Sequence, residues 1–241
     1  MVACADVMEE AQNRALVYRM LAQVFFAPLS SQQVEKLAVV DWKAVAEAED
    51  VLLADGCNDV YRALRRLNTG TCDELAADYT AVFYGVTTHE GRSAMPYASL
   101  FAGNDGQVMG LPRGRMYRLL KSEQMRTAGE LDVPDDHLSF MLEFMAEQCD
   151  RAAQNLQRGD VRGACERFEL LRTFVEEEVL GWFPEFQELS MRLVRTRFYR
   201  GVLKITGALL SNESGLCTAS IEALKSFDAN CDDRPEALLE E

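Results

Sequence analysis

Apolar residues recur along most of this chain at the spacing of an amphipathic helix. Val17, Met20, Leu21 and Val24 lie at i, i+3, i+4 and i+7, so they share one helix face. The same period returns in five later stretches: 61–67, 75–83, 138–149, 168–179 and 189–210, of which the last predicts a helix longer than average. Alternating β-branched runs and Asn-Gly turns are absent from the sequence. The pattern therefore predicts an all-α fold, a single-domain helical bundle.

Proline, glycine and serine residues mark where these helices end. Pro28 ends the first one, and Ser30–Ser31 can cap the next. Gly85 is placed to end the helix over 75–83. From there to residue 114 the periodicity disappears and glycines are frequent, which predicts a long loop over 85–114. We expect a short helix to start after Pro112 and to end near Gly129.

No linker of proline or serine divides the chain, and no internal repeat is visible. We therefore expect one all-helical domain over 1–225. Residues 226–241 hold six acids against Arg234, which predicts a solvated acidic C-terminal tail.

Charge narrows the classes of function. The net charge is −14 and the pI is near 4.7, which argues against a nucleic-acid partner because such proteins need a basic surface. An acidic surface favours a cationic partner, although acidity alone also keeps proteins in solution. The stretch from Met1 to Glu10 has no basic residue, and no apolar run is long enough to cross a bilayer. We expect a cytoplasmic protein without membrane insertion.

The sequence lacks the common catalytic motifs. Neither a phosphate-binding loop, nor a dinucleotide-binding glycine motif, nor a nucleophile elbow is present. Its two histidines, His89 and His137, are too few for a histidine-based zinc site, and its seven cysteines form no Cys-x-x-Cys pair. We therefore expect no catalytic residue, no metal site and no cofactor.

Three short segments stand out together. The first is Met95-Pro96-Tyr97-Ala98-Ser99-Leu100-Phe101 in the predicted loop. The second is Pro134-Asp135-Asp136-His137-Leu138, followed by Leu142-Glu143-Phe144-Met145. The third is Gly181-Trp182-Phe183-Pro184-Glu185-Phe186. In this order and spacing the chain, over roughly residues 8 to 210, resembles the TorD/DmsD/NarJ family of redox-enzyme maturation chaperones, most closely its TorD/DmsD branch. Asp78-Tyr79…Phe83 also resembles a motif of that family.

The resemblance implies a TorD-like helical fold and a chaperone rather than an enzyme. Such a chaperone binds the twin-arginine leader, the apo catalytic subunit, or both, of a molybdopterin oxidoreductase of the DMSO-reductase family, and assists cofactor insertion before export. It also implies a monomer or a helix-swapped dimer. Two alternatives stay open: a NarJ-type assembly adaptor for a leaderless nitrate-reductase-like subunit, and a nucleotide-binding or nucleotide-hydrolysing enzyme.

The resemblance places Asp136, His137, Pro96, Tyr97 and Ser99 at the leader-binding groove, with Phe83 as an apolar wall by position. A leader offers two guanidinium groups followed by an apolar, helix-prone stretch, so its receptor needs carboxylates beside an apolar groove. Glu143 and Asp135 could add charge, and Met141 adaptable apolar surface. The full set of predicted peptide-binding residues is Phe83, Pro96, Tyr97, Ser99, Asp136, His137, Met141 and Glu143. Ala98 and Met141 stand where the family often has Glu, and Glu178 where it often has His.

Each of these residues also has a structural interpretation. Asp135 or Asp136 can cap the helix that begins near Leu138, and spacing alone favours this role. The apolar stripe from Leu138 to Met145 is more typical of core than of groove. The Trp182–Phe186 segment looks like a turn between two helices. We expect the basic residues of 192–204 to pair with acids on neighbouring helices, with a docking surface for the mature enzyme as the minor alternative.

Overall fold

The structure is a computed structural model that describes residues 2–45, 50–102, 111–125 and 133–232. Its helices are α1 (Val2–Phe26), α2 (Ser31–Ala38), α3 (Trp42–Val45), α4 (Val51–Leu64), α5 (Thr71–Phe83), α6 (Leu111–Ser122), α7 (Leu138–Gln157), α8 (Val161–Phe174), α9 (Phe183–Leu193) and α10 (Arg197–Asp232). A 3-10 helix, η1 (Ala98–Leu100), precedes α6, and a π-helix, η2 (Val175–Val179), continues α8. The prediction of an all-α fold is confirmed.

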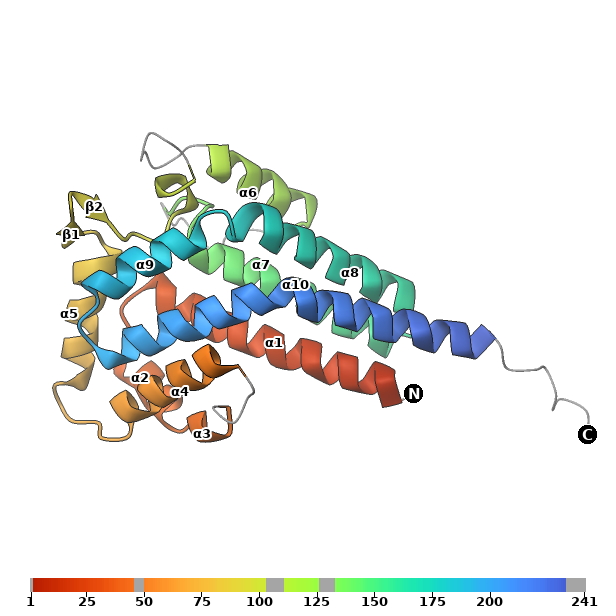
Figure 1. Ribbon diagram of the computed structural model, residues 1–241, viewed down its shortest axis with the longest axis horizontal. Helices are drawn as coiled ribbons and strands as arrows, with labels where there is room; N and C mark the ends of the chain where they lie inside the picture. The colour runs from red at the N-terminus through yellow and green to blue at the C-terminus, as the bar shows by residue number, and fades with distance from the viewer. Residues whose placement is uncertain (1, 46–49, 103–110, 126–132, 233–241) are drawn as a thin grey trace, which may run out of the picture.

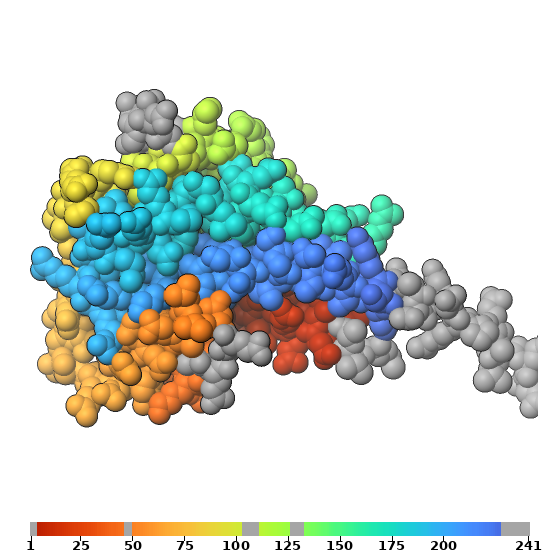
Figure 2. Space-filling model, viewed as in Figure 1, coloured from red at the N-terminus to blue at the C-terminus, as the bar shows by residue number. Residues whose placement is uncertain are grey.

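Four long helices form the core of the bundle. Helix α1 packs chiefly against α7, α7 packs against α8, and α10 packs against α8, α4 and α1. Figure 2 shows α10 as a band between α8 above and α1 and α4 below. Helices α2 to α4 cover one end of this core, and α6 lies on the opposite side, above α7 and α8 (Figure 1). None of the helices in the described residues is long and apolar enough to cross a membrane.

Local sequence explains most helix ends. Helix α1 stops before Pro28, and Ser30 caps α2 in a capping box with Gln33. Gly85 follows α5 with a φ of +73°, the left-handed conformation that glycine adopts without strain. Helix α6 includes Pro112 in its first turn and ends at Ser122, which is earlier than predicted; Gly129 lies outside the described residues.

The predicted long loop contains a small hairpin that the sequence did not indicate. Strands β1 (Thr88–His89) and β2 (Arg92–Ser93) pair antiparallel. The two residues between them, Glu90 and Gly91, both have positive φ, as a tight hairpin turn requires. Glu-Gly is a less typical sequence for this turn than Asn-Gly, which explains why the pattern was missed. The hairpin is followed by η1, and the predicted loop ends inside α6.

One helix prediction was wrong. The apolar period of 189–210 suggested a continuous helix, but Val194 is extended and separates α9 from α10. The buried carboxylate of Asp78 accepts hydrogen bonds from the backbone N–H groups of Arg195 and Thr196 and from the Thr196 hydroxyl. Asp78, a distant residue on α5, therefore fixes this turn. The local pattern of apolar residues does not indicate such a contact.

Helix α10 extends to Asp232, into the segment expected to be an acidic tail. Residues 233–241 lie outside the described residues. Within α10, Glu213 is fully buried and forms an ion pair of 3.0 Å with Arg14 of α1. Tyr18 donates a second hydrogen bond to the same carboxylate. Separating α1 from α10 at this point would leave a buried charge without its partner, which costs free energy. The ion pair therefore holds α1 against α10.

Candidate functional site

Two of the segments singled out in the sequence meet at the start of α7. Tyr97 and His137 form an antiparallel bridge. The N–H of Leu138 donates to the Pro96 carbonyl at 2.8 Å, and the N–H of Ala98 donates to the Asp136 carbonyl at 3.1 Å. We call this contact the loop–helix junction: residues 96–99 together with 136–138. Main-chain hydrogen bonds hold the two segments in register, so the junction is a fixed frame.

Asp136 binds the loop rather than the helix. Its side chain is 0% exposed, and its Oδ2 accepts hydrogen bonds from the N–H of Ser99 (2.8 Å) and from the Ser99 hydroxyl. Among the described residues its Oδ1 has no hydrogen-bond partner. The carboxylate thus closes the turn of η1. The expectation that Asp135 or Asp136 would cap α7 was wrong, because neither side chain bonds to the first turn of that helix.

His137 provides the cap instead. Its Nδ1 accepts a hydrogen bond of 3.2 Å from the N–H of Ser139, in the first turn of α7. The side chain is 4% exposed, and this burial lowers the pKa of His137 to about 4. The imidazole is therefore neutral at physiological pH and can accept a hydrogen bond, which the protonated ring cannot do. The positive end of the α7 dipole also favours the neutral form.

Three aromatic side chains surround this histidine. The ring of Tyr97 lies 4.9 Å from that of His137, and the rings of Phe140 and Phe26 lie 6.1 and 6.2 Å away. All three residues are half-buried, so each keeps part of its surface accessible to solvent. We call Phe26, Tyr97 and Phe140 the aromatic collar. Burial and the nearby Asp136 raise the pKa of Tyr97, which stays a neutral phenol.

Sequence reasoning missed two members of the collar. Phe140 follows His137 by three positions, so helical geometry alone places the two on one face. That signal was available in the sequence. Phe26 comes from the far end of α1 and reaches the site only through the packing of α1 on α7. No local pattern indicates this contact.

The other predicted site residues lie in two different settings. Phe83 is 2% exposed in an aromatic core cluster with Phe25, Tyr79, Phe186 and Tyr199. Met141 is 1% exposed on α7. Pro96 and Ser99 are buried within the junction. The structure thus brings Pro96, Tyr97, Ser99, Asp136 and His137 together, while Phe83 belongs to the aromatic core.

Glu143 lies further along α7, where it faces α1. Its side chain is 43% exposed, and one of its carboxylate oxygens is 3.9 Å from Arg19. Partial burial raises the pKa of Glu143, Arg19 lowers it, and Glu147 adds to the increase. Since Phe140 precedes Glu143 by one helical turn, this carboxylate is near the collar without being part of the junction.

The motif Asp78-Tyr79…Phe83 and the Trp182–Phe186 segment are structural. Asp78 holds the turn before α10, and the Tyr79 hydroxyl donates to the Phe25 carbonyl at 2.7 Å. Trp182 stacks on Phe101. Of the basic residues in 192–204, Lys204 binds Asp55 and Asp59 of α4, and Arg192 binds Glu188 of its own helix. The Lys204 pairs agree with the expectation that the cluster pairs with acids on neighbouring helices, whereas the Arg192 pair lies within α9.

Comparison with known proteins identifies the family to which this chain belongs. The family model described as nitrate reductase delta subunit matches residues 46–188, more than half of the chain. The chaperone protein TorD of Vibrio vulnificus is 28% identical over 207 residues, covering 84% of this chain and 94% of that protein. TorD of Aliivibrio fischeri is 26% identical over 205 residues, covering 83% and 91%. A solved structure described as a redox enzyme maturation protein from Archaeoglobus fulgidus aligns with 80% of this chain and 92% of its own, at 20% identity and a TM-score of 0.49. The chain therefore belongs to the nitrate reductase delta subunit family, the TorD/NarJ family, whose TorD relatives are named chaperones and not enzymes.

Proposed function

We propose that this protein is a cytoplasmic maturation chaperone for a molybdopterin oxidoreductase of the DMSO-reductase family. It binds the twin-arginine leader of the catalytic subunit, the apo subunit itself, or both, and assists cofactor insertion before export. Membership of the TorD/NarJ family and the chaperone names of the TorD relatives support this class of function. A leader peptide and a catalytic subunit are proteins and not nucleic acids. A cationic leader also suits the net charge of −14, because an acidic surface attracts cationic partners.

The observation that carries the proposal is the aromatic collar on its fixed frame. A leader presents an apolar, helix-prone stretch after its arginines, and such a segment is recognised by apolar side chains on rigid elements. Phe26, Tyr97 and Phe140 come from three different elements and converge on one buried histidine. Aromatic rings offer large contact area at low cost in conformational entropy.

Carboxylates flank this apolar surface. Asp135 precedes the junction with an 18% exposed side chain, and Glu143 follows the collar along α7. Both are charged groups that a guanidinium can pair with, and charge-assisted hydrogen bonds of this type are stronger than neutral ones. Each already has an arginine partner on this chain, Arg113 for Asp135 and Arg19 for Glu143. The leader's arginines would replace these internal partners.

In this proposal Asp136 and His137 are positioning residues. Both are buried, so they act by holding the loop and α7 together. Their removal would weaken binding by loosening the collar. Ser99 and Pro96 belong to the same frame, whereas Tyr97 would touch the leader directly.

A titration calorimetry experiment tests the proposal. The protein is titrated with a synthetic peptide that carries two consecutive arginines and then an apolar, helix-prone stretch. A second peptide has the same composition with its apolar stretch scrambled. Dissociation constants at or below micromolar for the first peptide, and binding at least about tenfold weaker for the second, are expected. Equal affinity for the two peptides would refute leader recognition by an apolar surface.

One observation favours the NarJ-type adaptor as a second candidate. The matching family model is described as nitrate reductase delta subunit, and such an adaptor would bind a catalytic subunit without a leader. Isolation of the protein with its client from cells distinguishes the two, since the retained subunit then either carries or lacks a twin-arginine leader. The oligomeric state, monomer or helix-swapped dimer, stays a prediction.

A further inference from the structure

Helix α6 has a charge opposite to that of the protein that carries it. Within Leu111–Ser122 it contains Arg113, Arg115, Arg118 and Lys121 and no acidic residue, in a chain whose net charge is −14. Its buried residues are Pro112, Met116 and Leu120. The helix thus combines closely spaced guanidinium groups with an apolar face.

The first two arginines bind acids of other elements, and one of these acids adjoins the candidate site. Arg113 Nε lies 3.4 Å from Asp135, which directly precedes Asp136 of the junction. Arg115 Nε lies 2.9 Å from Glu178 of η2. The side chains of the two acids are only 18% and 17% exposed. Helix α6 also packs against η1, the turn that Asp136 holds. It therefore covers the side of the junction where these carboxylates lie.

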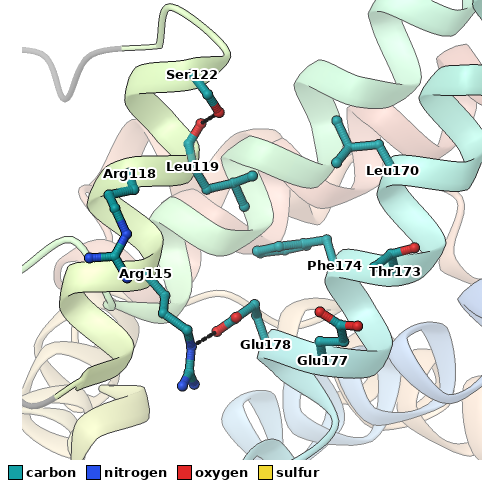
Figure 3. A pocket seen from close by; sticks show the side chains of 9 residues that line it. All are labelled: Arg115, Arg118, Leu119, Ser122, Leu170, Thr173, Phe174, Glu177 and Glu178. Carbon is teal, nitrogen blue, oxygen red and sulfur yellow. Dashed lines mark hydrogen bonds and ion pairs between the residues drawn. The ribbon is translucent and has the colours of Figure 1, made fainter.

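Helix α6 does not completely fill the space between itself and the helices on which it packs. A cavity of about 390 Å³ lies between α6 and the end of α8 with η2, and Figure 3 shows the side chains that line it. Leu119, Leu170 and Phe174 give it apolar walls, and Glu177 and Glu178 give it an acidic end. The dashed line in Figure 3 marks the bond from Arg115 to Glu178.

The other end of α6 is held differently. The Glu123 carboxylate, one residue beyond the helix, pairs with Arg151 of α7 and with Arg167 of α8. Its main-chain carbonyl accepts another hydrogen bond from Arg151. The C-terminal end of α6 is thus fixed by a network, whereas its N-terminal half is held by two partly exposed ion pairs, which contribute little individually.

We infer that the face beneath α6, made of Asp135, Glu178 and the apolar wall of α8, is the docking surface for the cationic end of a client leader, and that α6 occupies it as an internal substitute. This inference rests on the proposed function, and it adds Glu178 to Asp135 and Glu143 as a carboxylate that the leader's arginines can bind. The leader and α6 share the same chemistry: two nearby guanidinium groups followed by apolar helical residues. The acids select the cations through charge-assisted hydrogen bonds, and the cavity wall packs against the apolar stems of the arginine side chains, while the apolar stretch that follows them reaches the aromatic collar.

A double variant tests this competition. Arg113→Gln with Arg115→Gln removes both pairs that α6 makes with Asp135 and Glu178 and leaves the acids free. We expect it to bind the synthetic twin-arginine leader about tenfold more tightly than the unmodified protein, because the internal competitor is weakened. Lys121→Gln is the matched control: it removes a positive charge from the same helix, it does not line the cavity, and no ion pair is described for it. Its affinity should stay within about twofold of the unmodified protein.

Hydrogen exchange gives a second readout on the unmodified protein. Displacement of α6 predicts that the backbone amides of its N-terminal half lose protection when the leader binds, while those of α7 keep theirs. Equal leader affinity in all three proteins, together with unchanged protection of α6, would overturn the inference and leave the proposed function standing. Absence of leader binding in all three proteins would refute leader recognition, the part of the proposed function on which the inference rests, and the inference with it.

Discussion

His137 links the stability of the site to pH. Its pKa is lowered by burial from the ordinary 6.5 to about 4 in the folded protein. Since a group with a depressed folded pKa binds protons more readily when the chain is unfolded, acid favours unfolding. The contribution of the neutral ring is fully present above pH 6.5 and is lost as the pH falls from 6.5 towards 4. Replacement by asparagine, His137→Asn, removes the titrating group and keeps a residue that can cap a helix.

The size of the effect follows from the two pKa values. Protonation of a single group with this difference lowers the free energy of unfolding by about 2 kcal/mol between pH 7 and pH 5, and by about 3 kcal/mol once the pH is below 4. The histidine is 4% exposed, so solvent screening reduces this little. A protonated ring would also lose the hydrogen bond that Nδ1 accepts from the N–H of Ser139.

Urea unfolding of both proteins at pH 7 and pH 5 measures this contribution. All other titrating groups are the same in the two proteins, so the difference in their pH dependence isolates His137. The unmodified protein should lose about 2 kcal/mol more than His137→Asn between these pH values. An identical loss in the two proteins would refute the assignment of a buried, neutral histidine at the start of α7.

Three further substitutions test the packing of the bundle away from the loop–helix junction. Asp78→Asn replaces a carboxylate that accepts from Thr196 N–H and hydroxyl, and it should lower the free energy of unfolding by about 3 kcal/mol, measured by urea denaturation; an unchanged midpoint would contradict its role in separating α9 from α10. Gly201→Ala on α10 places a Cβ 2.6 Å from the Gly56 carbonyl of α4, so it should cost about 2 kcal/mol despite the higher helix propensity of alanine. Gly215→Ala on the same helix meets nothing within 4 Å and should raise stability by up to about 1 kcal/mol; similar shifts of the melting temperature in the two glycine variants would contradict the close crossing of α4 and α10.

The sequence predicted the elements better than their connections. Helix period and the breakers Pro28 and Gly85 were enough to place most helices, because these signals are local. The break at Val194 depends on Asp78, which is more than a hundred residues away in the chain. The β1–β2 hairpin depends on two residues of positive φ, of which only Gly91 is a usual choice. Long-range contacts and single-residue conformations of this kind produce no periodic pattern of apolar residues in the sequence.

The candidate site shows the same division. The resemblance placed Tyr97 and His137 together, and the structure joins them by a backbone bridge. The sequence does not show which residues face solvent: Asp136 is buried, where its carboxylate binds η1. Nor does it show that Phe26 of α1 contacts His137. The basic residues of α6 were not singled out from the sequence, and their acidic partners are brought together only by packing.

If the half-buried aromatic collar contacts the leader, loss of one of its rings must weaken leader binding, and a titration measures this. Tyr97→Ala removes a ring of the collar, whereas Tyr61→Ala removes a half-buried ring on α4, where its neighbour is Lys43. With the synthetic twin-arginine leader, Tyr97→Ala should weaken binding by about tenfold or more, the range of a buried aromatic contact, and Tyr61→Ala should leave the dissociation constant unchanged. Equal affinities of the two variants for that peptide would contradict the account.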